Sequence, residues 1–211
     1  MEIKEKALKT VEILEKLYPD AKCSLNYDHP YELLIATRLS AQCTDERVNK
    51  VTKNLFRKYT NLEDFANADY EELCKDVKSC GFFRTKARSI IDMSKKIITE
   101  FGGNVPDNMK DLLSLPGVGR KTANLIMGDV YGKPAIVTDT HFIRICGRIG
   151  LTKNKVPAKV ESDLVKLIPA DKSSEFCHRI VIFGREICNA RAPKCNECPM
   201  NGFCDFYLTK S

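Results

Sequence analysis

The chain has 211 residues and carries 34 lysines and arginines against 28 acidic residues, a net charge of +6. This length supports one large or two small cores, and the mild positive charge suits a polyanionic partner without requiring one. No apolar run approaches the length of a membrane span, and the charged N-terminal segment lacks the apolar stretch of an export signal. We therefore expect a cytoplasmic protein whose ten cysteines stay reduced.

The first half of the chain predicts one helix after another and hardly a strand, so the expected fold class is all-α. Apolar residues recur at helical spacing from the N-terminus onward. A proline opens the second helix, Thr44 caps the next one, and a pair of glycines ends the last. The expected helices are 3–18, 30–40, one that begins after Thr44, 69–81 and 85–101.

Helical apolar spacing flanks the segment LPGVGRK, residues 115–121, on both sides. This is the pattern of a helix-hairpin-helix. Gly117 and Gly119, on either side of Val118, can take backbone angles closed to other residues and expose consecutive N–H groups to a phosphate beside a helix N-terminus. An ordinary glycine turn between core helices is the alternative. The flanking periodicity and the Arg-Lys pair that ends with Lys121 favour phosphate binding.

A break at residues 132–134 precedes further helices, expected over 141–149, 158–167 and 173–187. Asp139 lies just before the first of these. It is either a plain helix N-cap or a carboxylate that relays a proton and stabilises positive charge during a reaction.

The C-terminal tail holds four cysteines with six, two and five residues between them: Cys188, Cys195, Cys198 and Cys204. An iron–sulfur cluster tolerates such unequal gaps. Zinc usually takes two closely spaced cysteine pairs, and only Cys195 and Cys198 form one. The spacing therefore favours an iron–sulfur cluster over zinc, and it favours disulfides least.

The motifs together resemble the endonuclease III family of DNA glycosylases. The resemblance runs nearly end to end, and its four motifs are jointly specific. They are PYELLIATRLSAQCTD (30–45), LPGVGRKTANLI (115–126), VTDTHFIRI (137–145) and the C-x6-C-x2-C-x5-C tail.

The resemblance implies a base-excision repair enzyme that removes oxidised pyrimidines from duplex DNA and then cleaves the abasic strand by β-elimination. Lys121 would be the nucleophile that forms a Schiff base with the sugar, and Asp139 the catalytic carboxylate. The positive end of a helix disfavours a protonated ammonium in its first turn, which would help the amine of Lys121 to react. Relatives that excise mispaired adenine lack this lysine.

Two functions of other classes remain as alternatives. One is a non-catalytic helix-hairpin-helix DNA-binding protein with a structural metal, against which Lys121 argues. The other is an electron carrier, against which a single cluster on an otherwise large helical chain argues.

The resemblance also implies contacts with DNA. Gln42 would enter the base stack, and the loop 79–83 would supply a wedge, with Phe82 where well-known members have an aliphatic residue. Arg191 and Lys194, between the first two tail cysteines, would meet the DNA backbone. The alternatives are a surface amide for Gln42 and a solvated basic loop for Arg191 and Lys194.

Two domains follow from the resemblance: a helical barrel domain over 23–133 that contains the hairpin, and an iron–sulfur domain made of 1–22 plus 134–211. The four tail cysteines would hold a [4Fe-4S] cluster that fastens a tail with little core of its own. The expected partner is damaged double-stranded DNA. We expect a monomer associated with the nucleoid in the cytoplasm.

Overall fold

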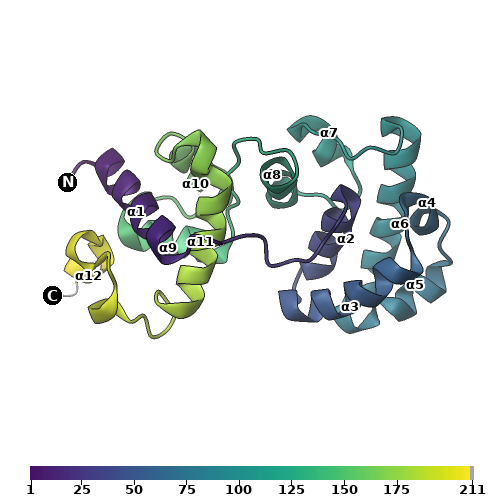
Figure 1. Cartoon of the computed structure of the whole chain (residues 1–211), viewed down its shortest axis with the longest axis horizontal. Coiled ribbons are helices and arrows are strands. Elements are labelled where there is room, and N and C mark those ends of the chain that lie inside the picture. The colour runs from purple at the N-terminus through teal and green to yellow at the C-terminus, as the bar shows by residue number, and fades with distance from the viewer. Residues whose placement is uncertain (210–211) are drawn as a thin grey trace. The chain divides into compact units, whose positions relative to one another are not determined.

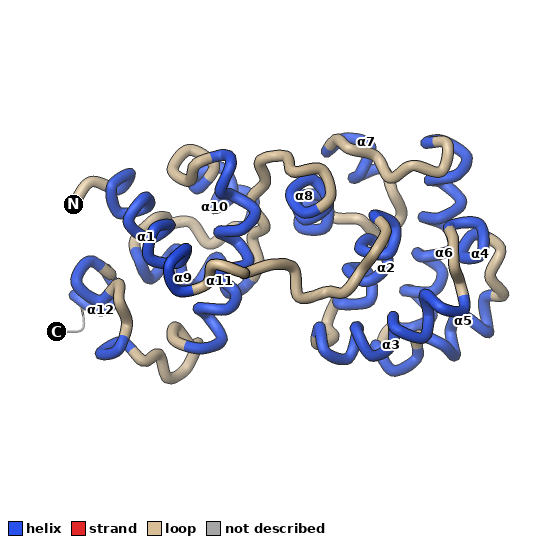
Figure 2. The backbone as a smooth tube through the Cα atoms, viewed as in Figure 1, coloured by secondary structure: helices blue, strands red, loops and turns tan. Residues whose placement is uncertain are grey.

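The computed structural model describes residues 1–209. Every regular element in this range is a helix and none is a strand, which confirms the all-α expectation (Figure 2). None of the described helices combines the length and apolarity that crossing a bilayer requires.

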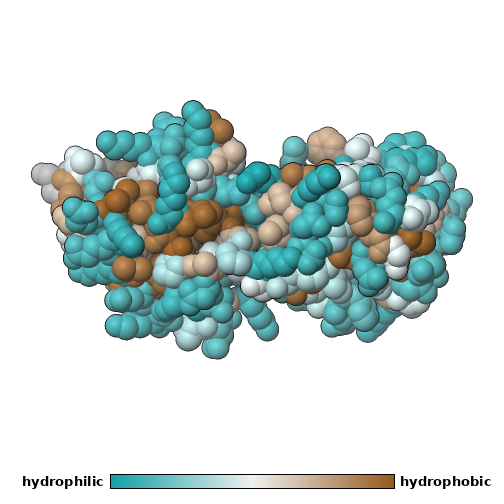
Figure 3. All heavy atoms as spheres, turned by 90° about the horizontal axis from the view of Figure 1, so that it is seen from above, coloured by the Kyte–Doolittle hydropathy of each residue, from teal (hydrophilic) through white to brown (hydrophobic). Residues whose placement is uncertain are grey.

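The chain divides into two compact units. One comprises residues 23–131, and the other comprises residues 1–22 together with 132–211. Hydrophilic residues cover most of the surface visible in Figure 3, and hydrophobic residues gather in smaller patches.

The unit 23–131 is built around its longest helix, α6 (Phe83–Phe101), which contacts α2, α4 and α5 (Figure 1). Fully buried side chains on these helices include Leu33, Leu34, Ile35, Phe65, Leu73 and Ile90. The other elements of the unit are α2 (Pro30–Ser40), α3 (Asp45–Lys58), α4 (Leu62–Ala66), α5 (Tyr70–Asp76), the 3-10 helix η1 (Lys78–Cys80), α7 (Met109–Ser114) and α8 (Arg120–Asp129).

Side chains cap the N-termini of several of these helices. Thr44 accepts a hydrogen bond of 3.3 Å from the Arg47 N–H at the start of α3, as its position in the sequence predicts. Asp69 likewise accepts one of 2.8 Å from the Glu72 N–H at the start of α5. The helix expected over 69–81 is shorter than predicted, because α5 ends at Asp76 and the chain tightens into η1 before Gly81.

The second unit combines the first helix of the chain with everything after residue 131. Its elements are α1 (Ile3–Leu17), α9 (Thr140–Ile149), α10 (Pro157–Leu164), η2 (Ala170–Lys172), α11 (Ser173–Glu186), η3 (Cys195–Glu197), η4 (Asn201–Phe203) and α12 (Asp205–Leu208). Helix α1 packs against α11. The Lys6 ammonium also donates to the Ile149 carbonyl at 3.1 Å and to Asp205 Oδ1 at 2.5 Å. The first helix is thus fixed to the tail of the chain.

Candidate functional site

The predicted hairpin is present between α7 and α8, which contact each other. The Val118 N–H donates to the Leu115 carbonyl at 3.1 Å and closes the turn. Gly117 has φ +79°, and a Cβ atom there would lie 3.0 Å from Arg38 Nε and 3.1 Å from Ser89 Cβ. The backbone angle and the close approach of α2 and α6 therefore both require glycine at position 117.

Gly119 differs from Gly117. Its φ of −103° is open to any residue, so of the two hairpin glycines only Gly117 uses a backbone angle that favours glycine. A Cβ atom here would meet no atom of residues 1–209 within 4 Å. Gly119 is the N-cap of α8, and no side chain caps the helix. The N–H groups at this end are therefore open to an acceptor that approaches from outside.

Lys121 is the second residue of α8 and is exposed. Its ammonium makes no hydrogen bond or ion pair with the described part of the chain, residues 1–209. The helix itself is anchored through buried residues farther along, among them Ala123, Leu125 and Ile126. A rigid helix thus presents an unpartnered amine two positions after the open glycine.

Asp139 belongs to the other unit and is the N-cap of α9. Its Oδ1 accepts a hydrogen bond of 2.7 Å from the Phe142 N–H. Oδ2 makes no hydrogen bond within residues 1–209. The geometry of a helix cap is therefore present, and one carboxylate oxygen is left for another role.

Gln42 and Phe82 are the two non-glycine residues with a left-handed backbone among residues 1–209, with φ of 55° and 44°. Both are exposed, Phe82 by 67%. Such a conformation costs about 1 to 3 kcal/mol and is found mostly at functional sites. We refer below to residues 40–43 as the Gln42 turn and to residues 80–83 as the Phe82 turn.

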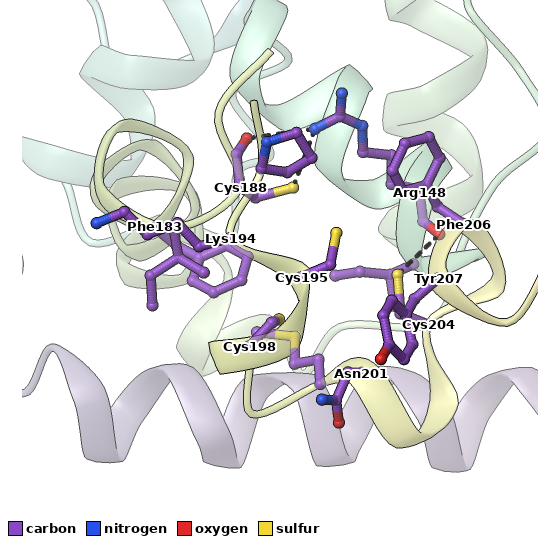
Figure 4. Close-up of a pocket in the computed structure, with 14 residues that line it drawn as sticks. Arg148, Phe183, Cys188, Lys194, Cys195, Cys198, Asn201, Cys204, Phe206 and Tyr207 are labelled. Carbon is purple, nitrogen blue, oxygen red and sulfur yellow. Dashed lines mark hydrogen bonds between the residues drawn. The ribbon is translucent and has the colours of Figure 1, made fainter. Parts of the chain in front are cut away.

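The four tail cysteines line one pocket, together with Arg148, Lys194, Phe206 and Tyr207 (Figure 4). All four are partly exposed and none forms a disulfide. Burial raises the pKa of the Cys198 and Cys204 thiols above its ordinary value. Metal binding would overcome this shift, because a metal takes the deprotonated thiolate.

The donor set fits an iron–sulfur cluster. Four thiols line the pocket, and thiolates are the ligands that such a cluster takes. One zinc ion draws four sulfurs to about 2.3 Å from a single point. A cluster of several irons spreads its thiolate ligands over a larger body.

Arg148, which no sequence motif indicated, binds the start of this tail through hydrogen bonds. Its guanidinium donates to the carbonyls of Asn189 at 2.7 Å and Ala190 at 2.8 Å, and to Cys188 Sγ at 3.3 Å. Four residues earlier on α9, Arg144 donates to the Cys188 carbonyl at 3.0 Å. The only sequence signal for this role is a pair of arginines one helical turn apart. It does not reveal their hydrogen-bond partners, which lie about 40 residues farther along the chain.

Arg191 and Lys194 are both exposed. The Lys194 N–H donates to the Ile187 carbonyl at 2.9 Å, which ties this loop to the end of α11. The structure thus places Lys194 at the cysteine pocket. It places Lys121 next to the hairpin glycines. Hydrogen bonds from Lys86 join the Gln42 turn to the Phe82 turn. Asp139 lies in a different unit from Lys121.

Comparisons with known proteins agree with this arrangement. The family described as HhH-GPD superfamily base excision DNA repair protein matches residues 35–170. Endonuclease III of Synechocystis is 48% identical over 202 residues, which cover 95% of this chain and 92% of that protein. Endonuclease III of Bacillus subtilis is 45% identical and covers 89% of this chain and 86% of its own.

Two solved structures are similar to the whole chain. One is a non-covalent endonuclease III–DNA complex and the other a trapped endonuclease III–DNA covalent intermediate. Each has a TM-score of 0.93 and 41% identity, and each comparison covers 100% of this chain and 99% of the solved chain. The chain therefore belongs to the endonuclease III family of the HhH-GPD superfamily of base-excision DNA repair proteins.

Proposed function

We propose that this base-excision repair glycosylase and abasic-site lyase removes oxidised pyrimidines from duplex DNA and cuts the strand through a Schiff base on Lys121. The main support for this proposal is that Lys121, which is exposed and has no partner within residues 1–209, lies two positions after Gly119, the uncapped start of α8. An anion held at that helix start would bring a DNA sugar close to the amine.

In the proposed reaction the neutral amine of Lys121 attacks C1′ of the deoxyribose, and the damaged base leaves with the electron pair of the glycosidic bond. The sugar ring opens to an imine with the lysine. Loss of a C2′ proton then pushes electrons toward the imine, and the 3′ phosphate leaves. The similar structure of a trapped covalent intermediate with DNA supports this route.

Asp139 is the carboxylate that we assign to the same reaction. Its Oδ1 holds the start of α9, and its free Oδ2 would accept a proton from the attacking amine or offset positive charge on the sugar. The two readings of this residue are therefore compatible, because one carboxylate has two oxygens.

The proposed DNA contacts fall into two kinds. The backbone N–H groups around Gly117, Val118 and Gly119 would hold a phosphate without reading sequence, and Arg191 and Lys194 would add charge. Gln42 and Phe82 would fill the space left by the extruded base. Their exposed, strained backbones support this role.

We infer that the tail cysteines Cys188, Cys195, Cys198 and Cys204 hold a [4Fe-4S] cluster. The cluster would supply structural cohesion to the tail, since the proposed reaction transfers no electron. Arg148 would position the first ligand through its bond to Cys188 Sγ. Iron and sulfide analysis of anaerobically purified protein tests this assignment, with about four of each expected. Stoichiometric zinc without sulfide in active protein would contradict it.

Borohydride trapping tests the nucleophile. Added during reaction with abasic DNA, borohydride should reduce the imine and fix the protein to the strand. Lys121→Gln should abolish trapping while DNA binding persists. Lys110→Gln is a matched control, because Lys110 is the exposed second residue of α7 just as Lys121 is of α8.

Trapping of the Lys121→Gln protein at the parental level would assign the chemistry to another amine. If the unmodified protein is folded and binds DNA, but neither excises bases nor is trapped on abasic DNA, this result would favour the non-catalytic alternative.

A further inference from the structure

Lys86 is a buried lysine on α6, with 1% of its surface exposed. Its ammonium donates hydrogen bonds of 2.8 Å to the carbonyl oxygens of Leu39, Ala41 and Cys80. An ammonium has three N–H donors, so each one is used on a backbone carbonyl. Lys86 is therefore fully satisfied without a carboxylate.

These bonds join the Gln42 turn to the Phe82 turn. Ala41 directly precedes Gln42, and Cys80 begins the Phe82 turn, so their carbonyls meet at one nitrogen. The backbone N–H of Lys86 also donates to the Phe82 carbonyl at 3.0 Å. One residue thus binds the segments that carry both left-handed residues.

A buried ammonium is costly because it loses its hydration. Burial lowers the pKa of Lys86, and the neighbouring groups that act on its charge are the thiols of Cys80 and Cys43 and the guanidinium of Arg38. An apolar residue of similar length would fill the space without this cost. A strained backbone conformation, however, persists only where the surrounding contacts hold it in place, as the hydrogen bonds of Lys86 do for these two turns.

We infer that Lys86 is a positioning residue that holds Gln42 and Phe82 together in the conformation that fills the gap left by an extruded base. The inference rests on the proposed function, in which these two residues enter the base stack. Lys86 acts through the two turns, so its contribution belongs to base extrusion and not to the chemistry at Lys121.

The test compares Lys86→Met, which keeps the length of the side chain and removes its donors, with Lys95→Met, the same change at an exposed position of α6. Lys86→Met should lower excision of a paired oxidised pyrimidine about tenfold, as expected when buried carbonyls lose their partners. Excision of the same base from single-stranded DNA should fall less, because it requires no unpairing. Lysis and trapping on abasic DNA should stay close to the parental rates.

Two further readouts separate positioning from general stability. The fluorescence of 2-aminopurine beside the lesion, which rises as the stack opens, should rise more slowly with Lys86→Met. In a variant that already carries Gln42→Ala and Phe82→Ala, Lys86→Met should add little further loss. Equal losses on paired and single-stranded substrates, or a fully additive loss, would overturn the inference.

If Lys86→Met does not fold, Lys86→Gln replaces it, because glutamine keeps two N–H donors. The same cycle then applies with a smaller expected loss. If Gln42→Ala and Phe82→Ala leave excision unchanged, the proposed roles of those residues fail and the inference fails with them. If they lower excision while Lys86→Met behaves like Lys95→Met, the inference alone fails.

Discussion

Helices α8 and α9 carry the two proposed catalytic residues at their N-termini, and they begin differently. Helix α9 has a carboxylate cap, with Asp139 Oδ1 bound to the Phe142 N–H at 2.7 Å. Helix α8 begins at Gly119 without any side-chain cap. The N-terminus of α9 is thus satisfied from within the chain, whereas that of α8 is left for an anion from outside.

In the proposed function, this difference separates the site that holds DNA from the site that reacts with it. An uncapped helix start with open space in front of it is a place for a phosphate. A capped start already holds a negative charge, which would repel a phosphate but would stabilise a cationic sugar.

The largest effect is expected from Asp139→Asn. Asparagine caps a helix about as well as aspartate, so the melting temperature should change little. Base excision should fall about 100-fold or more, because an amide neither accepts a proton well nor offsets positive charge. Lysis of a preformed abasic site should suffer less, since the glycosidic bond is already broken. Single-turnover assays on the two substrates measure both.

The control for this change is Asp69→Asn, because Asp69 caps α5 with a similar bond of 2.8 Å to the Glu72 N–H. It should leave excision unchanged. If a well-folded Asp139→Asn protein excised bases at the parental rate, Asp139 would be only a cap.

Gly119→Asp would make the start of α8 resemble that of α9. The fold should tolerate it, since a Cβ atom there meets nothing within 4 Å among the described residues. The new carboxylate should occupy the N–H groups and repel phosphate, so that duplex binding weakens about tenfold. Gly119→Asn introduces a neutral cap and should weaken duplex binding less. Fluorescence anisotropy with undamaged duplex measures the affinity of both variants. Unchanged binding by Gly119→Asp would remove this helix start from the interface.

The two hairpin glycines should differ in their effect on stability. Gly117→Ala forces a side chain into φ +79° and against Arg38, so the free energy of unfolding should fall by about 1 kcal/mol or more. Gly119→Ala should change it by less than about 0.5 kcal/mol. Urea denaturation of both variants measures the difference. Equal losses would mean that Gly119 also serves the fold.

The smallest effect is expected from Lys194→Ala. It would remove one of the proposed phosphate contacts, so the salt dependence of duplex binding should lose about one unit of log–log slope. Lys159→Ala, at an exposed lysine of α10, is the control and should leave the slope unchanged. An unchanged slope for Lys194→Ala would place this loop outside the interface.

Most of the helices could be predicted from the sequence, because periodicity and caps are local. Helix α3 begins after Thr44 and helix α6 stops before Gly102, as the sequence predicts. Helix α4 was missed because its five residues are too short to show a period. The end of α5 was misplaced because local propensity does not show where a helix tightens into a 3-10 turn.

The candidate site was only partly predictable, because local sequence patterns do not show tertiary contacts. Spacing alone identified the hairpin and the cysteine tail. It did not distinguish Gly117 from Gly119, because the difference depends on how close Arg38 and Ser89 approach. Nor did it identify Lys86 or Arg148, whose side chains donate hydrogen bonds to carbonyls up to 47 and 42 residues away, respectively. Contacts of this kind come from the tertiary fold.

The bond between Lys6 and Asp205 spans 199 positions of the chain and has a consequence for synthesis. Helix α1, with Ala7, Val11 and Leu14 on its apolar side, is synthesised well before its packing partner α11. Residues 23–131 form a compact unit of their own and can fold in the meantime. The nascent chain therefore carries an unpaired apolar helix until α11 has been made, and we expect it to be most prone to aggregation during that interval.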